Sequence, residues 1–425
     1  MRVLIVGGGG REHALAWKLL QDDPTLEIIA APGNPGIASI GRCAPVSATD
    51  LTALMALARK EKVSFTIVGP EAPLSLGIVD RFREAGMAIF GPTQAAARIE
   101  TSKRFAKELM LRANIPTASA RTFTTIHEAK DEVRRLGAPV VVKASGIAAG
   151  KGVIVAMSIA EADAAIDDML DAKVFGDAGA EVLVEEYMQG EEISLFALTD
   201  GTNVLPMLAA QDHKRIGEGD TGLNTGGMGA YAPVSIASAG LLQSVRDRIL
   251  LPTLTAMRDE GCAFTGLLFV GLMLTEQGPK VVEFNCRFGD PETQAILPLL
   301  GSSLLVAMRA IADGGSIRSL DPFFWRKAFA VTTVVAAEGY PGSVKGGDVI
   351  TLPEVPSGVM IFHAGTARNA DGALVTAGGR VLTVTAVAES FAAAQAASRA
   401  TAEAVQFRGR QLRRDIGWRE LQRLA

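Results

Sequence analysis

The stretch from Val281 to Glu292, VVEFNCRFGDPE, carries the side chains best suited to ion chemistry in this sequence. Side chains alternate along a strand, so Glu283 and Asn285 are expected on one face. Two oxygen ligands, with water and phosphate oxygens completing the shell, suit the way Mg²⁺ is usually held. Arg287, next on that face, can grip a carboxylate or phosphate with its forked guanidinium. Val282 and Phe284 fit a core on the opposite face, so a merely solvated strand edge explains the polar face less well.

A glycine-rich loop, KASGIAAGKGV, runs from Lys143 to Val153. It is not a Walker A loop, because one residue too few separates Gly146 from Gly150 and Gly152 stands where Ser or Thr would bind magnesium. It also joins two expected strands instead of a strand and a helix. We interpret it as a flap that closes over a triphosphate with backbone N–H groups and Lys151; a plain hairpin turn is the alternative.

The chain opens with a second glycine turn, VLIVGGGGREHAL. It fails the dinucleotide-binding fingerprint, because the third glycine would fall on Glu12 or His13 and no acidic residue ends the second expected strand. A glycine turn at a helix N-terminus still offers free backbone N–H groups to an anion, and Arg11 can add a charge-assisted bond. A purely structural turn is the alternative.

Two further segments carry polar side chains between expected strands. The acidic turn Glu185–Glu192 follows a strand, where backbone groups can read an adenine edge and a carboxylate can hold ribose hydroxyls. The stretch Gln211–Tyr231 is longer than an ordinary structureless connection, which favours a functional loop. Its candidate contacts are Asp212, Lys214, Arg215, Asn224 and Thr225.

The sequence shows no arrangement typical of a nucleophilic enzyme or a zinc site: there is no G-x-S-x-G, and the four histidines lack metal-binding spacing. A ligase that forms an acyl phosphate needs no enzyme nucleophile, because a metal ion and cations stabilise the transferring phosphoryl group.

The elements that must position these side chains follow an alternating pattern at first. Strand signals at Arg2–Val6, Leu26–Ala30, Ser64–Val68 and Met87–Phe90 alternate with helical stretches, which predicts a doubly wound parallel sheet. One long helix is expected from Thr93 past Lys103 to Asn114. Beyond it the pattern changes to compact α+β units.

The sequence therefore predicts a multidomain α/β and α+β protein. The expected domains are an N-terminal Rossmann-like unit (1–112), a small lobe with the glycine flap (113–190), a central lobe with the metal strand (191–327) and a small C-terminal α+β domain (328–425). A length of 425 residues supports several domains, since single cores stop growing at about 250–300 residues.

Composition narrows the expected partners. A net charge of −4 gives no global basic field for nucleic acid or acidic membranes, and no apolar run approaches the roughly 20 residues needed to cross a bilayer. Three cysteines without C-x-x-C spacing indicate a reducing compartment, so we expect a cytoplasmic protein. A basic cluster closes the chain and is interpreted as a solvated helix face in preference to a nucleic-acid site; it comprises Arg408, Arg410, Arg413, Arg414, Arg419 and Arg423.

The order of these motifs resembles the ATP-grasp superfamily. More narrowly, the chain is similar to the phosphoribosylamine–glycine ligase family in blocks spread from the first residues to RRDIGW, which ends at Trp418. The other blocks are GGGGREHALAWKL, APGNPG, VGPEAPL, QDHKR, NTGGMGAY and EFNCRFGDPET. The resemblance implies an N-terminal pre-ATP-grasp domain, an ATP-grasp core of two α+β lobes, and ATP-dependent ligation of glycine to 5-phosphoribosylamine through glycyl phosphate, the second step of purine synthesis.

The resemblance also implies a role for each candidate residue. ATP would be bound by Lys103, Lys143, Gly146, Gly150, Lys151, Gly152, Glu185, Tyr187 and Glu192, and Mg²⁺ or Mn²⁺ by Glu283 and Asn285. Glycine and 5-phosphoribosylamine would face Gly9, Gly10, Arg11, Glu71, Asn224 and Thr225, with Arg287, Lys214 and Asp212 in catalytic positions. The partners implied are these small molecules, with neither nucleic acid nor membrane, and the protein would be a monomer or weak homodimer.

Two positions depart from the family pattern, which usually has Asp at Ser145 and Pro at Leu223. The strand GLLFVGLML also lacks the acidic metal ligand that many ATP-grasp enzymes carry, so a further ligand must come from elsewhere or from water. The alternatives left open are another ATP-grasp ligase with a different acceptor, a nicotinamide dehydrogenase built on the first domain, and a nucleotide-binding protein without activity.

Overall fold

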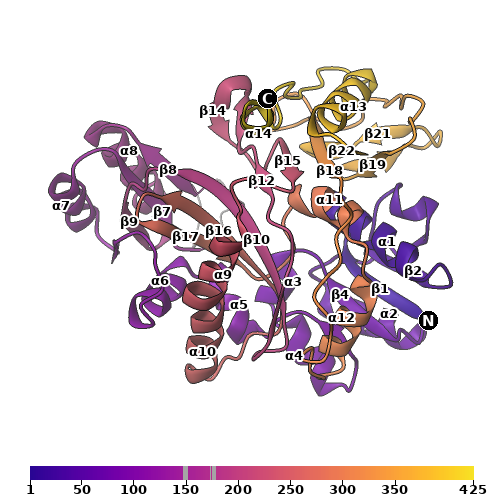
Figure 1. The fold of residues 1–425 in the computed structure, drawn as a ribbon, viewed down its shortest axis with the longest axis horizontal. Coiled ribbons are helices and arrows are strands. Elements are labelled where there is room, and N and C mark those ends of the chain that lie inside the picture. Colours follow the sequence, from indigo (N-terminus) through magenta and orange to yellow (C-terminus); the bar gives the residue numbers. More distant parts are fainter. Residues whose placement is uncertain (147–151, 173, 175–178) are drawn as a thin grey trace.

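The computed structural model describes residues 1–146, 152–172, 174 and 179–425. Figure 1 shows four sheet-based units: the N-terminal sheet in indigo, a small lobe at the left, a central sheet, and a C-terminal unit in yellow. This is the α/β and α+β multidomain architecture that the sequence predicts. Among the described residues, no helix is long and apolar enough to cross a membrane.

The N-terminal sheet is parallel, with the order β3-β2-β1-β4-β5. Its central strand is buried on both faces, as covering helices require, since Val3, Leu4, Ile5 and Val6 have no exposed surface. The predicted doubly wound sheet is confirmed. The strands are β1 (Arg2–Gly7), β2 (Glu27–Pro32), β3 (Arg42–Cys43), β4 (Phe65–Val68) and β5 (Ile89–Phe90), and the helices are α1 (Gly10–Asp22), α2 (Leu51–Lys60), α3 (Glu71–Ser75) and α4 (Ile78–Glu84).

The prediction of one long helix from Thr93 to Asn114 is wrong. The structure has two helices there, α5 (Gln94–Thr101) and α6 (Lys103–Arg112). Ser102 between them has extended backbone, and its hydroxyl oxygen accepts a bond from the Phe105 N–H at 3.2 Å. A serine N-cap of this kind satisfies a free N–H at a helix start, which favours a new helix there.

The small lobe is an antiparallel sheet of order β6-β9-β7-β8, formed by Ala120–Phe123, Val182–Glu186, Val140–Ala144 and Val153–Ala156. Helices α7 (Ile126–Leu136) and α8 (Ile159–Leu170) pack against it and against each other. Strands β7 and β8 pair antiparallel, and Lys143 pairs with Val153 at the end next to the glycine loop. The loop therefore joins two strands, as predicted. Residues 147–151 of that loop, including Gly150 and Lys151, lie outside the described residues.

The central sheet has the order β11-β10-β16-β17 and carries the metal strand at its edge. A bulge interrupts β17: Glu283 pairs with Gly271 and Val281 with Leu272, which leaves Val282 without a partner. The period-two prediction therefore fails locally, and Val281 joins Phe284 in the core while Val282 is half-exposed. The strands are β10 (Glu191–Thr199), β11 (Val204–Pro206), β16 (Gly266–Thr275) and β17 (Gly278–Asn285), and α9 (Ala239–Val245) and α10 (Leu251–Asp259) lie beside them.

The stretch Gln211–Tyr231 contains regular structure, contrary to the prediction of a polar loop. Its two ends, β12 (Gln211–Asp212) and β15 (Gly229–Ala232), extend the C-terminal sheet, whose order is β12-β15-β18-β22-β19. Its middle is a hairpin of β13 (Arg215–Gly217) and β14 (Thr221–Asn224). The rest of this region comprises β18 (Phe329–Ala336), β19 (Val359–His363), β20 (Thr366–Arg368), β21 (Leu374–Thr376), β22 (Arg380–Ala388), α11 (Glu292–Ile296), α12 (Leu304–Ala312), α13 (Phe391–Ala404) and α14 (Trp418–Leu424).

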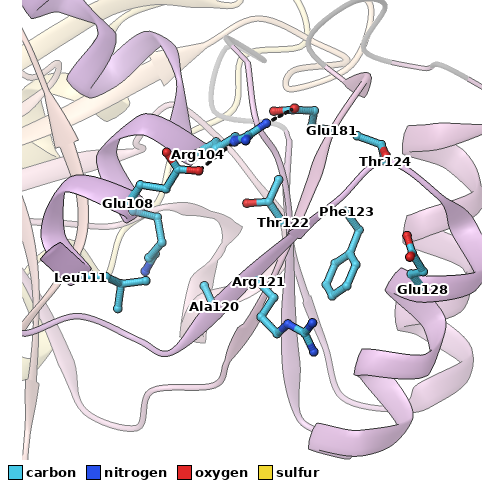
Figure 2. Close-up of a pocket in the computed structure, with 11 residues that line it drawn as sticks. Arg104, Glu108, Leu111, Ala120, Arg121, Thr122, Phe123, Thr124, Glu128 and Glu181 are labelled. Atoms are coloured by element: carbon cyan, nitrogen blue, oxygen red, sulfur yellow. Dashed lines mark hydrogen bonds and ion pairs between the residues drawn. The ribbon is translucent and has the colours of Figure 1, made fainter.

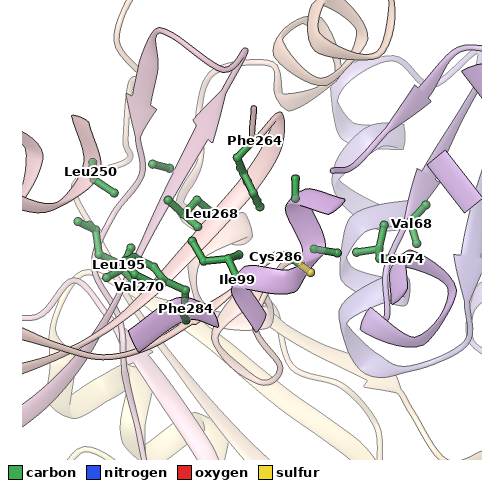
Figure 3. Packing of buried hydrophobic residues seen from close by; sticks show 14 of the residues in the cluster. Val68, Leu74, Ile99, Leu195, Leu250, Phe264, Leu268, Val270, Phe284 and Cys286 are labelled. Atoms are coloured by element: carbon green, nitrogen blue, oxygen red, sulfur yellow. The ribbon is translucent and has the colours of Figure 1, made fainter. Parts of the chain in front are cut away.

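A shared apolar core fixes the N-terminal unit against the central sheet. Figure 3 shows Ile99 of α5 between Leu268 and Phe284 of the central sheet and Val68 and Leu74 of the N-terminal unit. Because one continuous core spans both units, the glycine turn after β1 and the metal strand β17 are held in a fixed relation.

Candidate functional site

The Glu185 carboxylate bridges two buried lysines where the small lobe meets the central sheet. Its oxygens lie 2.7 Å from Nζ of Lys143 and 3.1 Å from Nζ of Lys107, and all three side chains are at most 6% exposed. Burial alone would raise the pKa of Glu185, but the two ammonium groups hold it below its usual value. The carboxylate is therefore ionised, and the two lysines are fixed around it.

A backbone carbonyl at the bulge of β17, the metal strand, contacts Lys143 of this lysine pair. Nζ of Lys143 also donates to the Val282 carbonyl at 3.2 Å, next to Glu283 in the chain. Lys103, at the start of α6, donates to the Gly146 carbonyl at 3.3 Å. Burial would raise the pKa of Glu283, but the positive charges of Lys214, Lys103 and Lys143 lower it. Three predicted cations thus surround an ionised carboxylate.

Lys214 lies in a second group of charges, around Glu192 on β10. Its ammonium pairs with Glu192. Burial would lower the pKa of Lys214, but Glu192, Asp212 and Glu283 raise it well above its usual value. Burial, together with the nearby Glu292 and Glu192, raises the pKa of Asp212 to about 8 although Lys214 opposes that shift. Burial also raises the pKa of Glu292, whose Oε1 accepts a bond from Ser194 Oγ at 3.0 Å.

Arg287 connects the metal strand to the N-terminal unit. Its Nη2 lies 2.9 Å from Oε1 of Glu100 and donates to Asn285 Oδ1 at 3.1 Å, while its Nε lies 3.3 Å from Glu71. Burial would lower the pKa of Arg287, but the Glu100 and Glu71 carboxylates raise it. The guanidinium is therefore held in one orientation next to Asn285.

The glycine turn after β1 faces the same region. Arg11 Nη1 donates to the Phe288 carbonyl at 3.0 Å, and Arg11 N donates to Asp290 Oδ2 at 3.3 Å. The Gly9 N–H donates to Glu12 Oε2 at 2.6 Å. Two of the N–H groups predicted to bind an anion therefore already meet carboxylates of the protein itself.

Taken together, carboxylates and buried cations pair with one another in a series, the charged line, that runs from Glu185 in the small lobe to the glycine turn. Such an arrangement can hold a polyphosphate, a divalent cation and a carboxylate close to one another, because each negative group meets a fixed positive one. Ser194 and Cys286 lie in this line, but their side chains donate to Glu292 and Glu100, and burial raises the pKa of the Cys286 thiol well above its usual value, so neither is an activated nucleophile.

Comparison with known proteins decides the family. Three family descriptions match in order: "Phosphoribosylglycinamide synthetase, N domain" at residues 1–100, its "ATP-grasp (A) domain" at 101–293, and its "C domain" at 330–419. The chain belongs to the phosphoribosylglycinamide synthetase family.

Individual members of that family match over their full length. The phosphoribosylamine–glycine ligase of Pseudomonas aeruginosa is 50% identical, covering 100% of this chain and 99% of the relative, and that of Xanthomonas campestris is 48% identical with the same coverage. A solved phosphoribosylamine–glycine ligase of Thermotoga maritima superposes with a TM-score of 0.87 at 35% identity, covering 98% of this chain and 100% of that one.

More distant structures share the fold alone. The biotin carboxylase domain of Hydrogenobacter thermophilus 2-oxoglutarate carboxylase superposes with a TM-score of 0.72 at 17% identity, covering 97% of this chain and 91% of that one. This phosphoribosylglycinamide synthetase family member is thus an ATP-dependent ligase with the ATP-grasp fold, and ATP binding follows from the fold.

Several residues predicted for the site lie at the margins of the charged line. Tyr187 follows β9 with 42% of its surface exposed. Thr225 holds its own loop, because its hydroxyl donates to the Lys214 carbonyl at 2.8 Å and accepts from the Gly227 N–H at 3.0 Å. Asn224 ends β14 opposite Arg215. Gly10 begins α1, and a Cβ added there would lie 2.6 Å from Nε2 of Gln294. The Gly152 carbonyl, next to β8, accepts a bond from the Ala144 N–H at 2.8 Å. The roles of these residues stay predictions.

Sequence reasoning missed four charged residues that the fold brings to the site. Lys107 lies one turn after Lys103 on α6, so the i, i+4 spacing is the signal that would have found it. Asp290 and Glu292 were in the quoted motif but received no role; Asp290 accepts a bond from the Arg11 N–H. Glu100 meets Arg287 only through a tertiary contact, and no spacing in the sequence marks it.

The donor set of the metal strand fits a divalent cation that ATP brings with it. Within the described part of the chain, no three Asp, Glu, His or Cys side chains gather as a closed metal cage. Glu283 and Asn285 offer two oxygens, as Mg²⁺ with phosphate and water ligands requires. The strand opposite lacks a carboxylate, but a Cβ added to Gly271 there would lie 3.7 Å from Oε1 of Glu192 on β10. Besides Glu283 itself, whose Cγ would lie 3.4 Å away, Glu192 is the acidic side chain that reaches this position.

A separate surface pocket of about 370 Å³ lies between α6 and β6, on the small lobe (Figure 2). Its charged residues pair with each other: Arg104 lies 2.9 Å from Glu108 and 2.8 Å from Glu181. Of its lining residues, Lys107 alone contacts the charged line described above. The pocket therefore adds nothing to the candidate site.

Proposed function

We propose that this chain ligates glycine to 5-phosphoribosylamine at the expense of ATP, giving glycinamide ribonucleotide, ADP and phosphate. The observation that carries the proposal is the match to phosphoribosylamine–glycine ligases over the entire chain, with the N, ATP-grasp and C domains in order. The reaction is the second step of purine biosynthesis.

The chemistry proceeds in two steps. The glycine carboxylate attacks the γ-phosphorus of ATP and releases ADP, forming glycyl phosphate. The amine nitrogen then attacks the acyl carbon and expels phosphate. Neither step needs an enzyme nucleophile, so the residues act by holding charge and position.

The charged line supports a role for each group in these steps. Lys103 and Lys143 would neutralise phosphate oxygens, since both ammonium groups face Glu283. Arg287 would hold a substrate carboxylate or phosphate, with its orientation fixed by Glu100 and Glu71. Asp212, whose pKa lies near 8, would accept a proton from the attacking amine at physiological pH.

Glu283 and Asn285 would hold Mg²⁺ or Mn²⁺, and the cation would offset the charge that develops on the transferring phosphoryl group. The flap, Gly146 to Gly152, would cover the phosphates, with Glu185, Tyr187 and Glu192 toward the nucleoside.

We propose the domain limits 1–112, 113–190, 191–327 and 328–425. We also propose a cytoplasmic location, and a monomer or weak homodimer without nucleic-acid or membrane partners.

Coupled ADP release tests the proposed function. Turnover is expected with glycine plus 5-phosphoribosylamine, and background rates with bicarbonate or formate and their own acceptors. Activity confined to bicarbonate or formate would instead assign another ATP-grasp ligase. Glu283→Ala should abolish turnover, whereas Glu276→Ala, at the exposed tip of the same hairpin, should not. Full activity of Glu283→Ala would remove the metal assignment.

A further inference from the structure

The hairpin β13–β14 carries predicted substrate residues at its base. Lys214 precedes β13, Asn224 ends β14, and Thr225 joins the two ends because its N–H and hydroxyl both donate to the Lys214 carbonyl at 2.8 Å. The strands pair at only two positions with an irregular register. A two-stranded hairpin this short is at best marginally stable alone, so its position depends on what it packs against.

The C-terminal segment supplies that contact through one buried arginine. Arg413 is fully buried, and its Nη1 donates to Asp220 Oδ1 at 2.8 Å and to the Arg215 carbonyl at 3.1 Å. Its Nε and Nη2 donate to the two oxygens of Asp415, each at 2.8 Å. Asp415 in turn accepts a bond from the Gly219 N–H at 2.8 Å. Both the tip and the first strand of the hairpin are thereby fixed.

Two neighbouring arginines extend this contact to the other side of the site. Nη2 of Arg419 lies 2.6 Å from Oδ2 of Asp220. Arg423 pairs with Glu191, the first residue of β10, and with Glu420. Glu191 precedes Glu192, the partner of Lys214. Figure 1 shows α14 beside β14, at the end of the molecule where the C-terminal unit meets the central lobe.

Two other arginines of the basic cluster behave differently. Arg408 is 72% exposed beside Asp348, and Arg414 is 63% exposed beside Glu403. The interpretation of the whole cluster as a solvated helix face is therefore wrong for Arg413, which is inaccessible, and incomplete for Arg419 and Arg423. A fully buried guanidinium with three carboxylate contacts and one carbonyl contact is held by a specific set of partners.

We propose that Arg413, Arg419 and Arg423, the C-terminal clamp, are positioning residues for the ligation reaction. They hold the hairpin and the start of β10, so that Lys214 and Glu192 meet in a fixed geometry. This inference rests on the proposed function, because it concerns where glycine and 5-phosphoribosylamine are placed. None of the three arginines need touch a substrate.

Steady-state kinetics of Asp220→Asn and Arg413→Lys test the clamp. Loss of a charge-assisted contact should raise KM for glycine or 5-phosphoribosylamine by about ten- to a hundredfold. KM for ATP should stay within about twofold, because both variants change the hairpin contact and leave the Arg423–Glu191 pair beside Glu192 in place. The effects of the two changes on KM should be less than additive in the double variant, since both remove the Arg413–Asp220 contact, while Asp220→Asn also weakens the pair with Arg419. Arg408→Gln, an exposed arginine of the same cluster, should leave all three KM values unchanged.

Amide hydrogen exchange tests the same variants in a measurement that does not depend on turnover. Amides of residues 213–225 should exchange faster in Asp220→Asn, while those of the N-terminal sheet keep their rates. Unchanged exchange in the hairpin, unchanged KM values, or an equal rise in all three KM values with a lower thermal midpoint would overturn the clamp. If the wild-type chain fails to ligate glycine, the proposed function falls, and the exchange experiment still decides whether the arginines hold the hairpin.

Discussion

Glu185→Gln is the sharpest test of how the site is held together. The substitution keeps the shape of the side chain but removes the negative charge between Lys143 and Lys107, which are 2.7 and 3.1 Å away and buried. An amide also turns an N–H₂ donor toward an ammonium that needs an acceptor. Breaking a buried ion pair by removing one partner costs about 3–5 kcal/mol. We therefore expect the small-lobe sheet to lose that much stability.

The loss should be measured locally, because a chain of several domains does not unfold as one unit. At about 1.4 kcal/mol for each factor of ten, amides of β7 and β9 should exchange roughly a hundredfold to a few thousandfold faster. Glu181→Gln is the matched control: it lies just before β9 and pairs with the half-exposed Arg104, so it should cost at most about 1 kcal/mol. Equal effects of the two variants would refute the reasoning.

The pH dependence of stability is an independent test of the ion pairs that Glu185 makes with Lys143 and Lys107. The folded pKa of Glu185 lies below its usual value, so its stabilisation is present above the unfolded pKa of about 4.3 and is lost as the pH falls through the folded value. The stability difference between wild type and Glu185→Gln should therefore be constant near neutral pH and shrink only below about pH 4. A difference that already closes between about pH 7 and 6 would show that another group is responsible.

Two further predictions concern the turn and the coupled carboxylates. Gly8→Ala should destabilise the protein by about 1–3 kcal/mol, because an added Cβ would lie 2.4 Å from the Gly33 carbonyl oxygen. Gly240→Ala, which meets nothing within 4 Å at the start of α9, should be neutral or stabilising within about 1 kcal/mol; thermal unfolding compares the two. Asp212 has a folded pKa of about 8, above its unfolded value of about 3.9, so the stability it contributes at low pH is lost as the pH rises through about 8. The thermal midpoint of Asp212→Asn, measured without ligands from about pH 5 to 9, should therefore rise relative to wild type, and a constant difference would contradict the shifted pKa.

The sequence predicted those parts of the fold whose signals are local. The N-terminal strands and the β16–β17 hairpin are apolar runs with turn residues between them, and the structure confirms them. The strands inside Gln211–Tyr231 were missed because β15 pairs with β18, about a hundred residues later, and no local periodicity reports such a partner. Ser102 was overlooked as an N-cap because the helical pattern continues on both sides of it.

The grouping of these charged side chains was predictable where chemistry and position coincide in one motif. Glu283 and Asn285 lie on β17 as predicted, whereas Arg287 was predicted on the same strand face but lies beyond the end of β17, from where it donates to Asn285. The bulge at Val282 was not predictable, although it turns the Val282 carbonyl toward Lys143. Glu100 lies on a helix with an ordinary surface sequence, and only the tertiary fold reveals that it holds Arg287 and the Cys286 N–H.

The pairing of these charges bears on how anionic substrates enter. Among the described residues, Lys143 already meets Glu185, Lys214 meets Glu192, and Arg287 meets Glu100 and Glu71. A buried cation without a partner would be costly, so each one is neutralised by a carboxylate of the protein. An entering phosphate or carboxylate must therefore compete with a partner that is already in place. A weakly charged anion gains little from that exchange, whereas a triphosphate that carries its own metal ion supplies several oxygens and a compensating cation at once. The carboxylates thus hold the cations ready and, for the same electrostatic reason, discriminate against small anions.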